Sequence, residues 1–312
     1  MQYKLIFLAI TILFVGFVPA CDNGSGTQKG NIQMYVEPEW TLINGIEPGE
    51  DAENIKDGWR VEYNTFYMSI GEVAVGKSNQ TPAYTMNKHY IVDLKNTPLS
   101  GALVAEFKDV PEGHWDQVSY AMPAASEQSE TLGTVPANVM ARMKDNGLAV
   151  KLSMTLTKEN GQRCPYLVNT NNPADPQRPC DAVSTITADW ELPFPARAGG
   201  CQTELETGLT VPAGGTVAIK LTIHADHFFF TTFRHTDVTR IVQHIVDADL
   251  NADGEVTFTE LEATPVTVLV SDIFDLSMIP GQLNTLLDYV RWATITLPHY
   301  QGDGGCPQRT PL

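Results

Sequence analysis

Hydrophobic positions recur with a period of two through most of the chain between Trp59 and Phe233. The clearest alternation of apolar and polar side chains covers residues 148–157 and 217–224. One apolar and one polar face per strand predicts an antiparallel β-sandwich of the jelly-roll or immunoglobulin type. Gly, Pro and Asn separate these runs from shorter ones with the same alternation, at residues 59–75, 90–94 and 103–107.

The spacing becomes helical after Thr236. One predicted helix covers residues 238–246 and a second covers Gln282–Thr296, each with apolar residues on one face. His244 falls in the first of these helices, where we expect it on the polar side. We therefore expect a β-sandwich domain at residues 31–234 and a helical segment at residues 235–312 packed on it.

The net charge of the chain argues against some classes of function. The 312 residues include 20 Lys and Arg and 37 Asp and Glu, a formal net charge of −17. Phosphate backbones need clustered cations, so nucleic acid is not an expected partner. The chain also lacks a G-x-G-x-x-G motif and a βαβ rhythm, which argues against a dinucleotide-binding fold.

The N-terminus has the composition of an export signal. Lys4 precedes an apolar run from Leu5 to Phe17, which is short for a transmembrane span and fits a signal peptide over residues 1–20. The run ends in Val-Pro-Ala-Cys at Cys21, which resembles the lipobox of bacterial lipoproteins. An ordinary secretory signal followed by an unrelated cysteine is the alternative.

The lipobox resemblance implies an acylated Cys21. Residues 21–30 would then form a flexible, lipid-anchored linker. The lipid bilayer is the implied partner, and the implied location is the bacterial cell envelope, facing the periplasm or the cell surface. The sequence does not indicate a protein or ligand partner.

Four further cysteines agree with export, because even numbers of cysteine in exported chains favour disulfides. Three pairings are possible. Cys164 and Cys180 flank a loop rich in Pro and Asn that has little apolar content to hold it, so we expect them to pair, which leaves Cys201 with Cys306. A zinc site is the alternative, although the chain has no C-x-x-C pair.

Residues 249–260 carry the most specific motif of the chain. Oxygen-bearing residues stand at loop positions one, three, five, seven, nine and twelve, and Gly254 at position six permits a sharp turn. The spacing resembles the EF-hand calcium loop and also the loops of dockerin modules. The resemblance implies Ca²⁺ as a cofactor, with these ligands: Asp249, Asn251, Asp253, Glu255 through its carbonyl, Thr257 through a water, and Glu260 through both carboxylate oxygens.

Calcium at this loop is expected to be structural. Extracellular calcium modules bind with dissociation constants of about 10⁻⁴–10⁻³ M, so the site would be mostly filled outside the cell. Residues 236–275 contain nine acidic residues and one basic residue, Arg240. Bound calcium would reduce the repulsion among these acidic residues. A turn that binds nothing is the alternative interpretation.

Histidines suggest a second metal site. His224, Asp226 and His227 follow the strand that ends at Ile223, and a Cys201–Cys306 bridge would bring His299 towards them. Three imidazoles and a carboxylate suit copper or zinc. Because His224 and His227 would point to opposite faces of a regular strand, shared ligation requires a bend after Ile223. Without a metal they would be ordinary histidines at a strand end.

No G-x-S-x-G, H-E-x-x-H or P-loop motif is present. The sequence therefore predicts a calcium-binding envelope lipoprotein that is a non-enzymatic binding or structural module. One alternative is a periplasmic copper- or zinc-binding protein that uses the histidines. The other is a hydrolase whose active site is assembled from separated residues, which a deep pocket lined by acids and histidines would favour.

Overall fold

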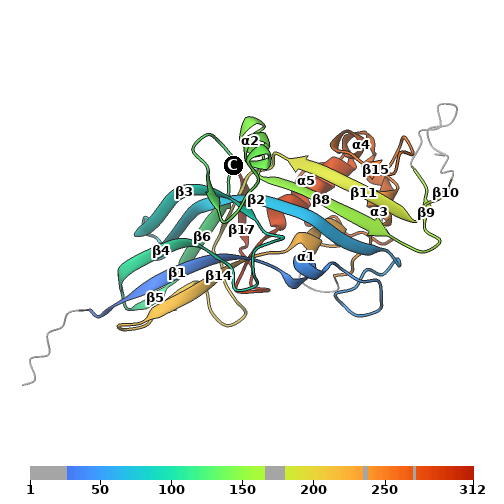
Figure 1. Ribbon diagram of the computed structural model, residues 1–312. Coiled ribbons are helices and arrows are strands. Elements are labelled where there is room, and N and C mark those ends of the chain that lie inside the picture. Colours follow the sequence, from blue (N-terminus) through green and yellow to red (C-terminus); the bar gives the residue numbers. More distant parts are fainter. Residues whose placement is uncertain (1–26, 166–179, 235–237, 270–271) are drawn as a thin grey trace, which may run out of the picture.

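The computed structural model of the protein describes residues 27–165, 180–234, 238–269 and 272–312 (Figure 1). The expected signal peptide, Cys21 and the first part of the expected linker lie outside the described residues. So does most of the loop between Cys164 and Cys180. Residues 29 and 30, which we expected at the end of the linker, already belong to the first strand.

The larger sheet has nine strands, and the long strands that lie next to each other in it pair antiparallel. Its main path is β15-β11-β8-β2-β6-β12-β17, and β3 and β7 extend it beside β2. In chain order these strands are β2 (Arg60–Gly76), β3 (Tyr84–Asp93), β6 (Gln117–Met122), β7 (Glu130–Leu132), β8 (Val150–Thr157), β11 (Thr185–Leu192), β12 (Ala196–Gly199), β15 (Glu255–Val256) and β17 (Gln308–Pro311).

The smaller sheet has four strands in the order β16-β14-β1-β4. They are β16 (Pro298–Tyr300), β14 (Thr216–Ile223), β1 (Lys29–Pro38) and β4 (Ala102–Pro111). The pair β1–β14 is parallel, as are β3–β7 and β11–β15, so the pairing is not purely antiparallel. Two small ladders complete the β-structure: β9 (Gln162–Arg163) with β10 (Asp181–Ala182), and β5 (Gly113–Trp115) with β13 (Leu209–Val211).

The helices are short. Most follow β14, and the longest, α5, packs against η1, α4 and β17. The helices are α1 (Trp40–Asn44), α2 (Ala137–Asp145), the 3₁₀ helix η1 (Ala225–Phe229), α3 (Gln243–Val246), α4 (Phe258–Ala263), the 3₁₀ helix η2 (Val266–Val268) and α5 (Leu286–Thr296).

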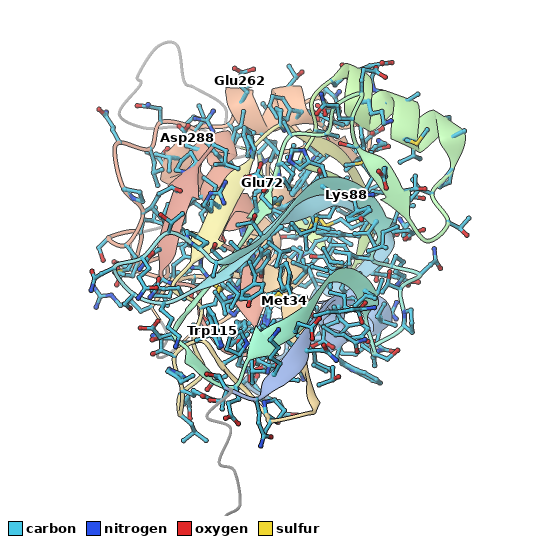
Figure 2. The ribbon with its side chains drawn as sticks, turned by 90° about the vertical axis from the view of Figure 1, so that its left-hand side faces the viewer. Met34, Glu72, Lys88, Trp115, Glu262 and Asp288 are labelled. Atoms are coloured by element: carbon cyan, nitrogen blue, oxygen red, sulfur yellow. A yellow bond between two sulfur atoms is a disulfide. The ribbon has the colours of Figure 1, made fainter. Side chains whose placement is uncertain are left out.

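The mainly β class is confirmed. Every second residue of β8 is buried, as the alternation predicted, and both sheets contribute to one hydrophobic core that also includes α5. Met34 on β1 lies within this core, whereas Glu262 lies on the outer surface (Figure 2). Residues 238–312 are not only helical, because β16 and β17 each form an edge strand of one of the sheets.

The helix predicted over residues 238–246 was largely wrong. Only α3 forms, because the backbone before it bonds to other segments: Ile241 N–H donates to Phe229, and the Arg240 carbonyl accepts from Lys56. His244 is buried rather than on a polar side, since α3 packs into the core against Phe274 and Tyr289. The helix α2, within the strand-rich region, was not predicted.

Candidate metal centre

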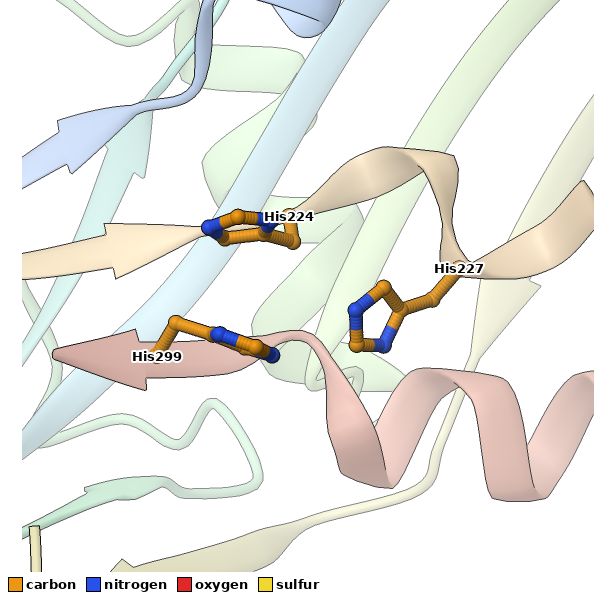
Figure 3. A group of neighbouring side chains, drawn as sticks. All are labelled: His224, His227 and His299. Atoms are coloured by element: carbon orange, nitrogen blue, oxygen red, sulfur yellow. The ribbon is translucent and has the colours of Figure 1, made fainter. Parts of the chain in front are cut away.

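His224, His227 and His299 come together from three elements (Figure 3). His224 follows β14, His227 lies in η1, and His299 is the middle residue of β16. The antiparallel pairing of β14 with β16 places His299 opposite Thr222, two residues before His224. The register of this strand pair therefore brings His299 close to His224.

The chain bends after Ile223, where shared ligation requires it. The carbonyl of Ile223 accepts from the N–H of Glu39, and the N–H of His224 donates to Leu297. β14 ends there, and η1 begins at Ala225 with its five residues buried. This change from strand to 3₁₀ helix places His227 on the same side as His224 instead of the opposite face.

The three imidazoles are in mutual contact. The rings of His224 and His299 are stacked with centroids 4.1 Å apart, and His227 meets His299 edge-on at 5.0 Å. One ligand nitrogen from each of the three lies within 4.8 Å of the others. Tetrahedral zinc with bonds of about 2.0–2.1 Å needs donor nitrogens roughly 3.4 Å apart. Shared ligation therefore requires the donor nitrogens to move closer together than this upper limit of 4.8 Å.

Hydrogen bonds fix the tautomers of two of these histidines. His224 Nε2 lies 3.1 Å from the carbonyl oxygen of Gly302, which only accepts, so Nε2 carries the proton and Nδ1 keeps its lone pair. The Thr296 hydroxyl donates to the carbonyl of Ala293, so it accepts from His227 Nδ1 at 2.8 Å. The lone pair of His227 is then on Nε2. Such outer contacts orient metal-ligating histidines.

Burial keeps His227 neutral. Desolvation lowers the pKa of His227 well below its ordinary value, and the neighbouring His299 and His224 lower it further. A neutral imidazole is the form that binds a metal, so His227 needs no deprotonation at neutral pH.

Glu39 and Asp226 lie near His224 Nδ1, the same nitrogen that keeps its lone pair. Glu39 Oε1 lies 3.4 Å from His224 Nδ1, and the two carboxylates form a second potential ligand group with this histidine. Burial, and then the charge of Asp226, raise the pKa of Glu39 to about 9. Glu39 is therefore protonated at neutral pH. Asp226, which we expected as a ligand, has one oxygen paired with Arg240, at 2.7 Å from Nε.

The histidines line a cavity of about 490 Å³. This volume is within the range of small-molecule sites. Its wall combines the three imidazoles with two phenylalanines, three arginines and four carboxylates: Phe230, Phe233, Arg234, Arg240, Arg309, Glu39, Glu53, Glu204 and Asp303.

The loop at residues 249–260 is held by its own side chains. Asp249 is buried, and its oxygens accept from the N–H groups of Ala252 and Gly254. Glu260 accepts from the N–H groups of Leu250 and Thr257, and Thr257 completes a capping box on α4. In the same loop Asn251 accepts from the N–H of Asp253, and Asp253 accepts from that of Glu255.

This loop contacts two neighbouring segments. The short strand β15, which is part of the loop, pairs with β11, and the buried Trp190 donates to the carbonyl of Val256 at 2.9 Å. Arg163 lies 2.7 Å from Oδ2 of Asp249, the oxygen that also accepts from Gly254. Among the His, Cys, Asp and Glu side chains of the described residues, groups of three with ligand atoms within 4.8 Å occur at the three histidines and at Glu39, His224 and Asp226, but not in this loop.

Both predicted disulfides are formed. Cys164 pairs with Cys180, and Cys201 pairs with Cys306. The N–H of Cys164 donates to Asp247, so the first disulfide is attached to the segment that precedes the calcium-type loop.

Sequence reasoning missed three residues of the centre: Glu39, Thr296 and Arg309. Glu39 follows the first strand and Thr296 ends α5, and neither lies in a recognisable motif. Arg309 had one usable signal, since it stands three residues after Cys306, which the disulfide attaches to the body of the protein.

Comparison of the chain with protein-family models, with curated proteins and with solved structures finds no match. Within the described residues, no helix has the length and apolar character that crossing a membrane requires.

Proposed function

We propose that the protein binds one transition-metal ion, copper or zinc, through His224, His227 and His299. The observation that carries the proposal is the convergence of three buried imidazoles, two of which have tautomers set for ligation through His224 Nδ1 and His227 Nε2. Imidazole nitrogen is a preferred ligand of both metals. A bound ion would be held by the chain's own nitrogens and would face the cavity.

Two differences favour the histidines over the calcium-type loop as the main site. The histidine nitrogens already lie within 4.8 Å of one another, whereas an oxygen of Asp249 is occupied by the guanidinium of Arg163. Neutral imidazoles also bind soft or borderline ions in preference to Ca²⁺, which takes oxygen ligands.

Metal analysis of the protein purified from the periplasm of an expression host tests this proposal. One equivalent of copper or zinc is expected, with loss of that metal in His227→Ala and His299→Ala. His114→Ala is the matched control, because His114 is exposed and pairs with Glu206 away from the cluster. Equal metal content in His227→Ala and His114→Ala would contradict the proposal.

A second candidate is calcium binding at residues 249–260, which the pairing of β15 with β11 supports. Calcium loops of the EF-hand type normally occur in pairs, and here the edge of the nine-stranded sheet supports the loop in place of a second loop. The N–H groups that bond to Asp249, Asn251, Asp253 and Glu260 turn the chain around these oxygens. On this proposal the loop and α4 are a single EF-hand module on a β-sandwich.

Calcium should raise the melting temperature of the protein, and a chelator should reverse the rise. At one hundred times the dissociation constant, a ligand specific for the folded state stabilises by about 2.7 kcal/mol. Glu260→Gln should remove this response, whereas Glu262→Gln, an exposed residue on the same helix, should keep it. The absence of any calcium response in the unaltered protein would exclude this candidate.

We further propose that the protein is exported and anchored by an acylated Cys21. The two disulfides support an oxidising compartment. Metabolic labelling with a palmitate analogue should mark the protein, and Cys21→Ser should abolish the label and release the chain from membranes. A labelled Cys21→Ser variant would contradict acylation at this cysteine.

The cavity is the feature that favours the hydrolase alternative. Catalytic zinc sites combine three protein ligands with an open position, and the protonated Glu39 beside His224 is a potential general acid. Hydrolysis of p-nitrophenyl acetate by the zinc-loaded protein, lost in His227→Ala, would support this alternative. Rates equal to those of the zinc-free protein would exclude esterase activity.

A further inference from the structure

Arg309 is a largely buried cation without a carboxylate partner among the described residues. It lies on β17 opposite Ala198 and lines the cavity beside the histidines. Its Nε atom is buried with no hydrogen-bond partner, and its Nη2 has one long contact, 3.3 Å, to the carbonyl of Pro298. Burial lowers the pKa of Arg309, but a guanidinium stays charged at neutral pH.

The other two arginines of the cavity are neutralised. Arg240 pairs with Asp226 and Glu53, both at 2.6 Å, and Arg234 pairs with Asp275 at 2.9 Å. Arg309 is therefore the cation in this wall whose donors are available to a ligand. Buried charges are normally paired, so its surroundings favour an anion.

The remaining lining indicates what kind of anion fits. Phe230 and Phe233 lie in the same wall with ring centroids 6.2 Å apart. Glu204 and Asp303 are exposed carboxylates that repel highly charged anions. A guanidinium binds a carboxylate through two parallel hydrogen bonds, and the phenyl rings suit an apolar body.

We propose that this cavity binds a small organic carboxylate, with its carboxylate on Arg309 and its apolar part against Phe230 and Phe233. The disulfide between Cys201 and Cys306 holds the chain three residues before Arg309 and so keeps the guanidinium in the wall. The ligand would lie beside the histidines, but its recognition does not require a metal ion.

Calorimetric titration of the chelator-treated, metal-free protein tests this inference separately from metal binding. The probe is benzoate, with acetate and sulfate as comparisons at constant ionic strength. We expect benzoate to bind more tightly than either comparison. Arg309→Gln should weaken benzoate at least about tenfold, and Arg309→Lys should recover part of the loss.

Arg142→Gln is the matched control, since Arg142 is an exposed arginine paired with Glu191 on the outer surface. Its affinity for benzoate should equal that of the unaltered protein. Equal affinity in Arg309→Gln, or the lack of any heat with benzoate up to millimolar concentrations, would overturn the inference. Equal binding of benzoate, acetate and sulfate would overturn the role given to the phenylalanines. None of these outcomes depends on the metal content.

Discussion

The imidazole of His299 stacks on that of His224 with ring centroids 4.1 Å apart, although 75 positions separate them in the chain. The contact follows from the pairing of β16 with β14, which places His299 opposite Thr222. A rigid sheet thus positions two of the three proposed ligands, while η1 supplies the third. Sites supported by strands hold their ligands more precisely than sites on loops.

Removing the hydroxyl that orients His227 should weaken metal binding without removing a ligand. Thr296→Val deletes the acceptor of the His227 Nδ1 proton, and loss of such an outer contact typically lowers metal affinity 10–100-fold. Competition with a chromophoric chelator measures the change in dissociation constant.

Thr294→Val is the control for this experiment. Thr294 is buried on the same helix, α5, and its hydroxyl donates to the carbonyl of Val290 as that of Thr296 does to Ala293. We expect unchanged metal affinity in this variant. A similar loss in both variants would mean that packing of the helix, and not the tautomer of His227, sets the affinity.

Breaking the buried pair of Arg240 and Asp226 should destabilise the fold strongly. Asp226 is fully buried, so Arg240→Gln leaves an uncompensated carboxylate, which typically costs about 3–5 kcal/mol. Urea denaturation measures this loss of unfolding free energy. Arg142→Gln breaks an exposed pair with Glu191 and should cost much less.

The double variant Arg240→Gln with Asp226→Asn separates charge from packing. Because it removes both charges, it should be more stable than Arg240→Gln alone. A double variant that is less stable than the single one would show that the charges are not the main contribution.

The features that the sequence predicted correctly are those that depend on local patterns of residues. The alternation over residues 148–157 predicted β8, and the polar loop between Cys164 and Cys180 predicted their pairing. Both depend on short stretches of chain. The expected bend after Ile223 is also a local property, since it depends on the spacing of His224 and His227.

What the sequence did not predict depends on contacts between distant segments. Arg240 lies in a run with helical spacing, but its guanidinium pairs with Asp226 and Glu53 and its backbone bonds to Lys56. These contacts replace the helix. Glu39 and Arg309 reach the cavity from opposite ends of the chain, and no periodicity or motif records that they meet there.

Arg163 should compete with calcium at the loop of residues 249–260. Its guanidinium lies 2.7 Å from Asp249, where the first calcium ligand is proposed, so Arg163→Gln should destabilise the calcium-free protein. Added calcium should then raise the melting temperature more in the variant than in the unaltered protein. Differential scanning fluorimetry with and without calcium measures both effects.

Arg60→Gln is the comparison for that experiment, because Arg60 forms exposed pairs with Glu47 and Glu62 away from the loop. It should leave the calcium response unchanged. A smaller calcium response in Arg163→Gln than in the unaltered protein would mean that Arg163 supports the loop instead of competing with the ion.

Mild acid should destabilise the protein through His244. Burial among Phe274 and Tyr289 lowers the pKa of His244 from 6.5 to about 3. The unfolded chain therefore binds a proton below pH 6.5 that the folded chain does not bind until about pH 3. Stability is fully present above pH 6.5 and falls by about 1.4 kcal/mol per pH unit between these values. The buried His227 adds to the same trend.

His244→Phe should flatten this dependence, because a ring of similar shape replaces the group that titrates. Urea denaturation at a series of pH values between 4 and 8, conditions chosen around the two pKa values, gives the unfolding free energy of each protein. The unfolding free energies of the two proteins should differ by a constant amount above pH 6.5. Below pH 6.5 the difference should change steadily as the pH falls. Parallel curves over the whole range would show that His244 does not cause the acid sensitivity, and His227→Ala would then be the variant to compare.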